Sequence, residues 1–275
     1  MTRLAIVIPI FNYEHMFPRW QKTFNDEWYA SIKKEFEITQ EEISIRYPQP
    51  SYPIEEKIIS SEQIDGEPII KQRIIRKVYG KRVGKGKVIR TELDQLKEKT
   101  PEYFICIDGD GQIPENSIKD CLRELRKEEI DAVLAKRTNL SGISEKRTGI
   151  ESFELSLIEK KYSKTLPDGQ CGCWGFKYNH YANNKLPLTA EEFEIELDFL
   201  INVLRNNLQY TYIPVKVNES TTTSFSEIQH SKKAIFLMKN LNIEKNVLCA
   251  TAREFNEGKG GIPNEYMEML EKINA

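Results

Sequence analysis

Two carboxylates, Asp108 and Asp110, stand one residue apart in the chain, and the amide of Gln112 follows two positions later. Carboxylate and amide oxygens are the ligands that hard divalent cations such as Mg²⁺ and Mn²⁺ prefer. The intervening glycines let the backbone turn tightly and approach a ligand. An Asp-Gly turn on the protein surface would use the same residue types. The apolar run 103–107 favours the metal site, because it predicts a buried strand that ends in acid at a sheet edge.

Basic residues that could meet a phosphate stand at two further places. Lys85 and Lys87 alternate with glycines at the expected start of a helix, where backbone N–H groups and lysine charge together suit a diphosphate. A solvated basic loop is the alternative, and the stretch lacks the Gly-Lys-Ser/Thr ending of a P-loop. Arg137 follows an apolar run, and it either faces phosphate or forms a surface salt bridge.

Alternating strands and helices must position these residues. We expect strands at 4–10, 73–79, 103–107, 131–135, 171–176 and 210–217. We expect helices at 19–36, 85–99, 117–127, 144–162, 190–208 and beyond 227, and strand and loop in the proline-rich stretch 42–68. This alternation predicts an α/β protein with a mostly parallel sheet, which binds ligands at the carboxyl ends of its strands.

The composition limits the classes of protein to which the chain can belong. With 275 residues, of which 39% are hydrophobic and 30% charged, the chain has the balance of a soluble globular protein. A net charge of −2 argues against bulk electrostatic binding to nucleic acid. Five scattered cysteines favour reduced thiols over a disulfide framework or a zinc tetrad. Because no signal peptide or run of ~20 apolar residues is visible, we expect a cytoplasmic protein without a transmembrane segment.

The last fifth of the chain looks helical, and we expect it to form an appendage, 226–275, to a main domain, 1–225. Its segment 232–239 is basic and amphipathic. A helix of this kind either lies on a membrane surface or packs on its own domain. The first alternative would place the protein at the inner face of the membrane through a peripheral contact.

Several segments, in order along the chain, resemble glycosyltransferases of family 2, and within that family the polyprenyl-phosphate (dolichol-phosphate) mannosyl- and glucosyltransferases. The Asp-Gly-Asp-Gly-Gln-Ile-Pro-Glu stretch at 108–115 is the most specific of these segments. The others are Ile-Val-Ile-Pro-Ile-Phe-Asn-Tyr-Glu at 6–14, the Gly/Lys-rich 84–90, 131–137, Asp-Gly-Gln-Cys-Gly at 168–172 and 193–215.

The resemblance implies a GT-A fold, a Rossmann-like sandwich around a mostly parallel central sheet, with 1–225 as the catalytic domain. It implies transfer of a sugar from a UDP- or GDP-linked donor to an acceptor hydroxyl or phosphate, with inversion at the sugar. The acceptor would be a carbohydrate or a polyprenyl phosphate. Mg²⁺ or Mn²⁺ would be held by Asp108, Asp110 and Gln112 and would act as a Lewis acid on the leaving diphosphate. The residues that would contact the nucleotide sugar are Pro9, Asn12, Glu14, Lys85, Asp108 and Arg137; for Pro9, Asn12 and Glu14, packing at the edge of the core is the alternative.

An inverting transfer needs a base to take the acceptor proton. Glu192, or Glu191 beside it, is the expected base, since both would lie in the first turn of the helix 190–208. Acidic residues also favour helix N-termini through the helix dipole alone, so this pattern has a second explanation. Asp168, in the glycine-containing loop, is the other acid expected to contact the sugar or the acceptor.

The chain also departs from the family pattern. An Asp-Asp-Gly-Ser element on the second strand is missing, which leaves the base of the donor open. Two other activities remain as alternatives: a sugar-phosphate nucleotidylyltransferase and a non-catalytic carbohydrate-binding protein on the same fold. The first should carry a Gly- and Arg-rich loop directly after the first strand, whereas this chain has Phe-Asn-Tyr-Glu-His at 11–15.

Overall fold

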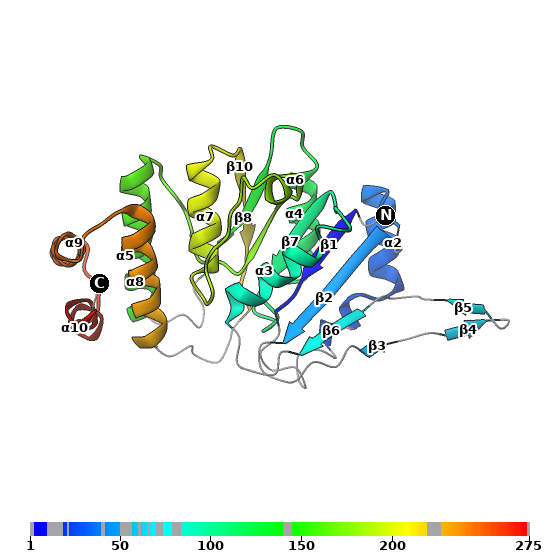
Figure 1. The fold of residues 1–275 in the computed structure, drawn as a ribbon, viewed down its shortest axis with the longest axis horizontal. Helices are drawn as coiled ribbons and strands as arrows, with labels where there is room; N and C mark the ends of the chain where they lie inside the picture. Colours follow the sequence, from blue (N-terminus) through cyan, green and yellow to red (C-terminus); the bar gives the residue numbers. More distant parts are fainter. Residues whose placement is uncertain are drawn as a thin grey trace.

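The structure is a computed structural model of the chain, and its ribbon is drawn in Figure 1. It describes residues 3–9, 19–20, 22–39, 42–49, 57–59, 62–64, 67–69, 74–78, 84–139, 145–218 and 227–273.

In this described part the strands form one eight-stranded sheet in the order β10-β8-β9-β7-β1-β2-β6-β3. The strands are β1 Leu4–Val7, β2 Ile43–Gln49, β3 Lys57–Ile59, β6 Ile74–Val78, β7 Tyr103–Ile107, β8 Ala132–Arg137, β9 Cys173–Lys177 and β10 Tyr210–Val215. β1 is parallel to β2 and β7, β2 to β6, and β8 to β10, which confirms the mostly parallel α/β sheet. β3 and β9 run antiparallel to their neighbours.

Helices cover both faces of this sheet. The helices of the described part are α2 Asp26–Phe36, α3 Lys85–Gln95, α4 Asn116–Leu125, α5 Glu145–Tyr162, α6 Asn179–Ala182, α7 Ile195–Arg205, α8 Glu227–Leu241, α9 Lys245–Gly258 and α10 Asn264–Lys272. The last two, α9 and α10, do not cover the sheet and lie beyond α5 and α8. Alternate residues of β1 enter different cores: Ala5 and Val7 pack with α3, α5 and α7, whereas Leu4 and Ile6 pack with α2 and α4. The continuous apolar run of the first strand is therefore explained by burial on both faces.

The expected helix at 190–208 is wrong at its start, because α7 begins only at Ile195. The buried carboxylate of Asp198 accepts backbone hydrogen bonds from Thr189 at 2.5 Å and from Ala190 at 2.7 Å. These bonds to the first turn of α7 hold residues 189 and 190 ahead of the helix, where they cannot continue it. Glu191 and Glu192 consequently lie in the connection before α7 and not in its first turn.

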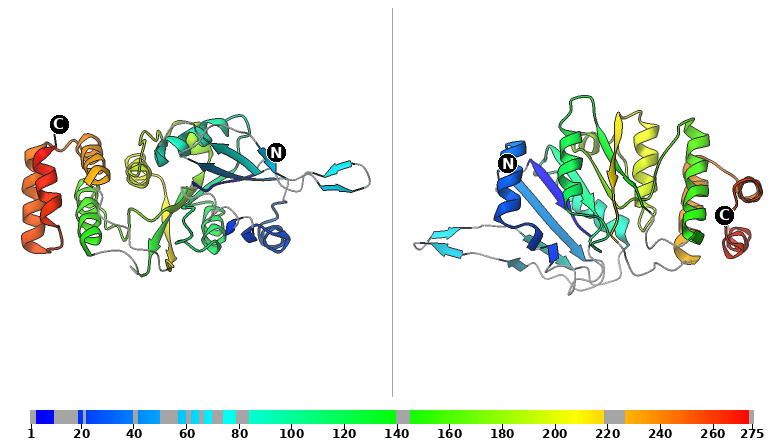
Figure 2. Two further views of the ribbon diagram at one scale, coloured as in Figure 1. Left: turned by 90° about the horizontal axis from the view of Figure 1, so that it is seen from below. Right: turned by 180° about the vertical axis from the view of Figure 1, so that it is seen from behind.

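A short antiparallel hairpin, formed by β4 Glu62–Ile64 and β5 Glu67–Ile69, lies in the proline-rich stretch. Figures 1 and 2 show this hairpin projecting beyond β3, away from the body of the sheet. At the opposite end of the molecule, Figure 2 shows α9 and α10 side by side, beyond α5 and α8.

The C-terminal helices pack closely on the rest of the protein. α8 contacts α5 and α10, and the buried side chains of α8, α9 and α10 belong to the same hydrophobic cluster as β7 and α7. The contact is tight at Gly149, where an added Cβ would lie 1.8 Å from the carbonyl oxygen of Gly261. The division into 1–225 and 226–275 stays a prediction.

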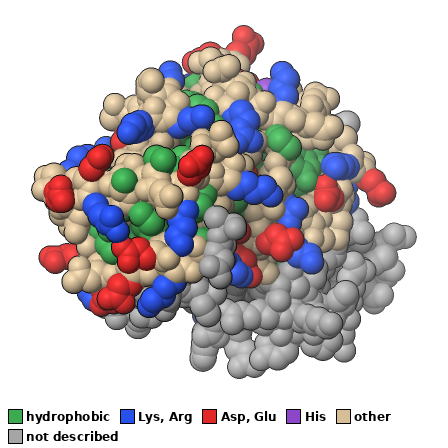
Figure 3. Space-filling view, turned by 60° about the vertical axis from the view of Figure 1, so that its left-hand side comes forward, with side chains coloured by type: hydrophobic (Ala, Val, Ile, Leu, Met, Phe, Trp, Pro, Cys, Tyr) green, Lys and Arg blue, Asp and Glu red, His purple; other side chains and the backbone are tan. Residues whose placement is uncertain are grey.

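The described helices include none that is both long and apolar enough to cross a membrane. Figure 3, which brings the C-terminal end of the molecule forward, shows basic and acidic side chains interspersed on that face.

Candidate functional site

Asp108 directly follows β7, and its backbone is fixed between two neighbouring strands. Its N–H donates to the carbonyl of Gly172, just before β9, at 2.8 Å. The N–H of Gly109 donates to the carbonyl of Pro9, beyond β1, at 3.1 Å, and the buried indole of Trp20 donates to the carbonyl of Gly109. Because β1 and β7 are parallel, their carboxyl ends meet here, as the sequence predicted for a ligand site of an α/β sheet.

The carboxylate of Asp108 is held from two sides. Oδ1 lies 2.5 Å from the ammonium of Lys85. Oδ2 lies against Gly172, where an added Cβ would be only 2.0 Å away. A glycine is required at 172 because any side chain there would displace the carboxylate.

Lys85 is a buried cation between two acids. Its Nζ lies 2.5 Å from Asp108 Oδ1 and 2.5 Å from Oε1 of Glu196 on α7. Burial alone would lower the pKa of Lys85, but the two carboxylates outweigh burial and raise it above its ordinary value. The lysine that the sequence assigned to a diphosphate is therefore charged and joins β7 to α7 in this structure.

Asp110 is the exposed member of the acidic pair. Its Oδ1 accepts the backbone N–H of Gln112 at 2.9 Å across Gly111, which has a positive φ of 76°. The pKa of Asp110 is raised, first by desolvation among the surrounding protein atoms and then by the charge of Asp108. Two carboxylates that repel each other in this way fit the binding of a divalent cation.

The described residues contain no group of three or more His, Cys, Asp or Glu side chains placed to hold a metal. The acidic pair still fits Mg²⁺ or Mn²⁺, since Mg²⁺ is usually bound by one or two carboxylates, water and substrate phosphates. Gln112 is anchored through its backbone, because its carbonyl accepts the N–H of Asn218 at 2.7 Å. The same asparagine donates its side-chain amide to the carbonyl of Gly111.

The start of α3 packs against the connection before α7. The N–H of Gly86 donates to the carbonyl of Glu192 at 3.1 Å, and the N–H of Lys87 donates to that of Glu191 at 3.0 Å. An added Cβ at Gly84 would lie 2.1 Å from the carbonyl oxygen of Glu191, so close approach requires glycine. The expectation that backbone N–H groups at this helix start hold a diphosphate is wrong for these two donors, because carbonyls already occupy them.

The side chains of the two expected base residues differ in their surroundings. Glu192 is about one-third exposed, and its Oε1 lies 2.9 Å from Lys232 on α8. Glu191 is more exposed, with its Oε1 3.6 Å from a guanidinium nitrogen of Arg90. Both lie beside the start of α3, close in the fold to Lys85, which contacts Asp108.

Two further acids of the same run, Glu194 and Glu196, are buried. Glu196 contacts Lys85, and burial first of all raises the pKa of its carboxyl. Glu194 is 8% exposed, and its Oε2 has no hydrogen-bond partner among the described residues. A run with four glutamates gives no local signal of which ones are buried; the position where α7 begins decides it.

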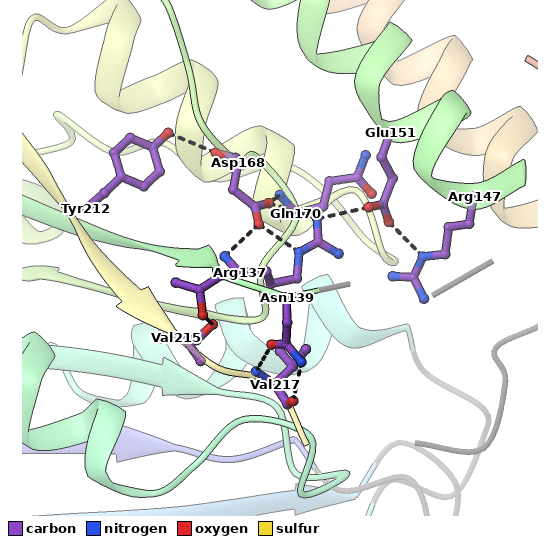
Figure 4. Close-up of polar contacts among 10 residues, drawn as sticks. Arg137, Asn139, Arg147, Glu151, Asp168, Gln170, Tyr212, Val215 and Val217 are labelled. Carbon is purple, nitrogen blue, oxygen red and sulfur yellow. Dashed lines mark hydrogen bonds and ion pairs between the residues drawn. The ribbon is translucent and has the colours of Figure 1, made fainter. Parts of the chain in front are cut away.

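Arg137 and Asp168 are paired with each other (Figure 4). The guanidinium donates to both carboxylate oxygens of Asp168, at 2.7 and 2.9 Å, and also to Glu151 on α5 at 2.9 Å. Glu151 in turn accepts from Arg147 at 2.7 Å, and the hydroxyl of Tyr212 donates to the carbonyl of Asp168. These ionic groups are mostly buried and hold β8 to α5. Roles of Arg137 and Asp168 in phosphate or acceptor binding stay predictions.

The remaining predicted contacts lie at the end of β1. Pro9 is buried, and its carbonyl accepts the hydrogen bond from the N–H of Gly109. Asn12 and Glu14 lie outside the described residues.

The fold is similar to that of several solved structures. Glucosyl-3-phosphoglycerate synthase from Mycobacterium tuberculosis in complex with UDP superposes with a TM-score of 0.54 at 14% identity, over 88% of this chain and 81% of that chain. Its complex with Mn²⁺, UDP and phosphoglyceric acid gives 0.58 at 12% identity, over 88% and 80%. The crystal structure of a mycobacterial protein gives 0.58 at 11% identity, over 88% and 76%.

These likenesses identify the fold as that of the GT-A glycosyltransferases. No family model matches the chain, and no curated protein matches it.

Proposed function

We propose that this protein is a metal-dependent glycosyltransferase that moves a sugar from a nucleoside diphosphate sugar to an acceptor. The observation that carries the proposal is the acidic pair Asp108 and Asp110 at the carboxyl end of β7, next to the end of β1, on a GT-A fold. The neighbouring enzyme has been crystallised with Mn²⁺ and UDP-glucose, which supports Mn²⁺ or Mg²⁺ and a uridine donor as the first choice.

The two aspartates have separate tasks in this proposal. Bound Mg²⁺ or Mn²⁺ supplies a Lewis acid that neutralises the leaving diphosphate. Asp110, exposed and close to a like charge, is the residue that holds the cation. Asp108 is immobilised by Lys85 and Gly172, so it offers a fixed acceptor for a hydroxyl of the ribose or sugar as well as a second metal ligand.

The base is proposed among the acids before α7. Glu192 is partly exposed and lies beside the start of α3, but its carboxylate also contacts Lys232. Glu194 is a further candidate, because its Oε2 is buried without a partner in the described part of the chain, and a catalytic role is one explanation for such a group. Glu191, the more exposed acid, and Asp168, which is engaged by Arg137, are the next candidates.

The acceptor is proposed to carry a hydroxyl or a phosphate. Structures of the neighbouring enzyme contain phosphoglyceric acid or glycerol 3-phosphate, so small phosphate-bearing acceptors are the first to test. The likeness to polyprenyl-phosphate transferases makes a polyprenyl phosphate the second, with a peripheral membrane contact through the C-terminal helices. Inversion at the sugar is part of the proposal on the same ground.

A ligand screen tests the function directly. Unfolding temperature is measured with UDP, GDP and their sugar conjugates, each with and without Mn²⁺, for the wild type and for Asp110→Asn. A nucleotide at about 100 times its Kd should stabilise the wild type by about 2.7 kcal/mol, and only with metal. Slow hydrolysis of one sugar donor should follow, and Asp110→Asn should lose both effects while keeping its fold.

Other outcomes of the same screen point to the alternatives. Stabilisation by a nucleoside triphosphate, with turnover of a sugar 1-phosphate, would indicate a nucleotidylyltransferase. Binding of sugars without any nucleotide effect would indicate a non-catalytic carbohydrate-binding protein and would refute the proposal.

A further inference from the structure

The helix α8 reaches the loop 168–172 through a buried lysine. Lys233 is 7% exposed, and its ammonium contacts Oε1 of Gln170. The amide nitrogen of the same glutamine donates to Oε2 of Glu154 on α5 at 2.6 Å. The side-chain amide of Gln170, drawn in Figure 4, is thus hydrogen-bonded through its oxygen and through its nitrogen to residues of α8 and α5. Both helices lie outside the sheet.

The loop 168–172 connects the Gln170 side chain to Asp108. At its first end, Asp168 is fixed by Arg137, and its Oδ1 accepts the N–H of Gln170 at 2.9 Å. At its other end, the carbonyl of Gly172 accepts the N–H of Asp108, and Gly172 lies directly against the Asp108 carboxylate. Because only one residue separates Gln170 from Gly172, a displaced Gln170 side chain would move the surface on which Asp108 rests.

A buried ammonium is costly unless hydrogen bonds and nearby acids compensate it. An apolar residue at 233 would fill the space between α5 and α8 without that cost, but it could not hold an amide oxygen. The charge of Lys233 also attracts Glu151 on α5 and Glu196 on α7, and its hydrogen bond to Gln170 is the contact that couples it to the loop.

We propose that Lys233 is a positioning residue: through Gln170 it sets the loop 168–172 and thereby the Asp108 carboxylate. The C-terminal helices would then be part of the functional site. The consequence for activity rests on the proposed function, whereas the consequence for the loop does not.

Thiol labelling tests the loop without any assumption about activity. Cys171 lies in the loop and is 6% exposed, and Cys121 in α4 is fully buried and reports opening of the whole protein. Rates of alkylation at both thiols are measured by mass spectrometry for the wild type and for Lys233→Met. We expect Cys171 to be labelled about 10-fold faster relative to Cys121 in the variant, as local opening requires.

Leu241→Ala provides the matched control. Leu241 is a buried residue at the far end of the same helix, so its truncation weakens α8 without removing a contact to the loop. In this variant, both thiols should be alkylated faster than in the wild type, and by the same factor. If Lys233→Met also changed both thiols by one factor, the lysine would be only structural and the proposal would be overturned.

Nucleotide binding then tests the link to Asp108. Calorimetry with UDP and Mn²⁺ should give a Kd raised about 10-fold in Lys233→Met and in Gln170→Met, with no further loss in the double variant, because residues acting as one unit are not additive. Leu241→Ala should bind as the wild type does at temperatures where it is folded. Failure of the wild type to bind UDP with Mn²⁺ would refute the proposed function. Wild-type binding together with an unchanged Kd in both Met variants would refute this inference alone.

Discussion

Gly172 gives the sharpest test of the geometry around Asp108. In Gly172→Ala, the new Cβ would lie 2.0 Å from Oδ2 of Asp108, where ordinary contact begins at 3.4 Å, so the carboxylate must retreat by about 1.4 Å. Functional groups have to be held to within about 0.5 Å of their productive positions, and this displacement is well beyond that tolerance.

The expected losses follow from two effects. Overpacking at a rigid site should lower the free energy of unfolding by about 1–3 kcal/mol. Displacement of a charged group that is fixed for the reaction should lower turnover by about 10²–10³-fold, on the scale of other electrostatic catalytic groups. The second effect corresponds to about 2.7–4 kcal/mol and should exceed the first. Because Asp108 is also the partner of the buried Lys85, its displacement adds to the loss of stability.

Gly258→Ala is the matched control. It makes the same chemical change at the end of α9, where an added Cβ would meet no atom within 4 Å. This variant should be as active as the wild type and at least as stable, since alanine suits a helix better than glycine and the added Cβ meets no neighbour. Urea unfolding, UDP calorimetry with Mn²⁺ and donor hydrolysis are measured for all three proteins. Turnover and UDP affinity of Gly172→Ala within threefold of the wild type would refute the reasoning.

Three further substitutions test other parts of the site and fold. Asp110→Asn should abolish the Mn²⁺-dependent rise in unfolding temperature with UDP without lowering the metal-free value, because it removes a charge that Asp108 repels. Glu92→Ala should cost about 3–5 kcal/mol in urea unfolding, since it strips the buried guanidinium of Arg46 of an ionic partner 2.5 Å away; an equally active protein with unchanged stability would contradict this. Burial alone would raise the pKa of Glu151, but Arg137 and Arg147 outweigh it and leave that pKa below its ordinary value near 4.5. The ionised carboxylate therefore stabilises the fold above that pH and loses its effect as the pH falls further, so the stability gap between wild type and Glu151→Gln should shrink on acidification from pH 7 to pH 3 in urea titrations.

Much of the architecture follows from local sequence. The run 103–107 is a strand with the predicted bounds, because five consecutive apolar or aromatic residues between polar ones can be buried only in the sheet. The expected helices at 117–127 and 144–162 agree with α4 and α5 to within two residues. The apolar residues of α4 form one buried face, whereas the buried side of α5 mixes apolar residues with Glu151 and Glu154. The position of Asp108 and Asp110 at a carboxyl strand end could be predicted for the same reason.

The antiparallel direction of β9 could not be predicted in this way. Strand direction depends on how the chain returns to the sheet, and the residues of a strand do not specify it. This direction brings Gly172, just before β9, against Asp108, just after β7. The contact of Asp108 with Gly172 therefore depends on topology.

By itself, the sequence determined that an acidic pair, Asp108 and Asp110, follows a buried strand, and these are the residues proposed to carry the chemistry. Only the tertiary structure decided what each charge faces. Lys85 meets Glu196 across 111 residues, Arg137 meets Asp168 across 31, and Lys233 meets Gln170 across 63. Buried charges must find partners wherever packing brings them, and the energy of such a pair depends on exclusion of water by elements far apart in the chain. The spacing of residues along the chain does not indicate which charged groups will be buried.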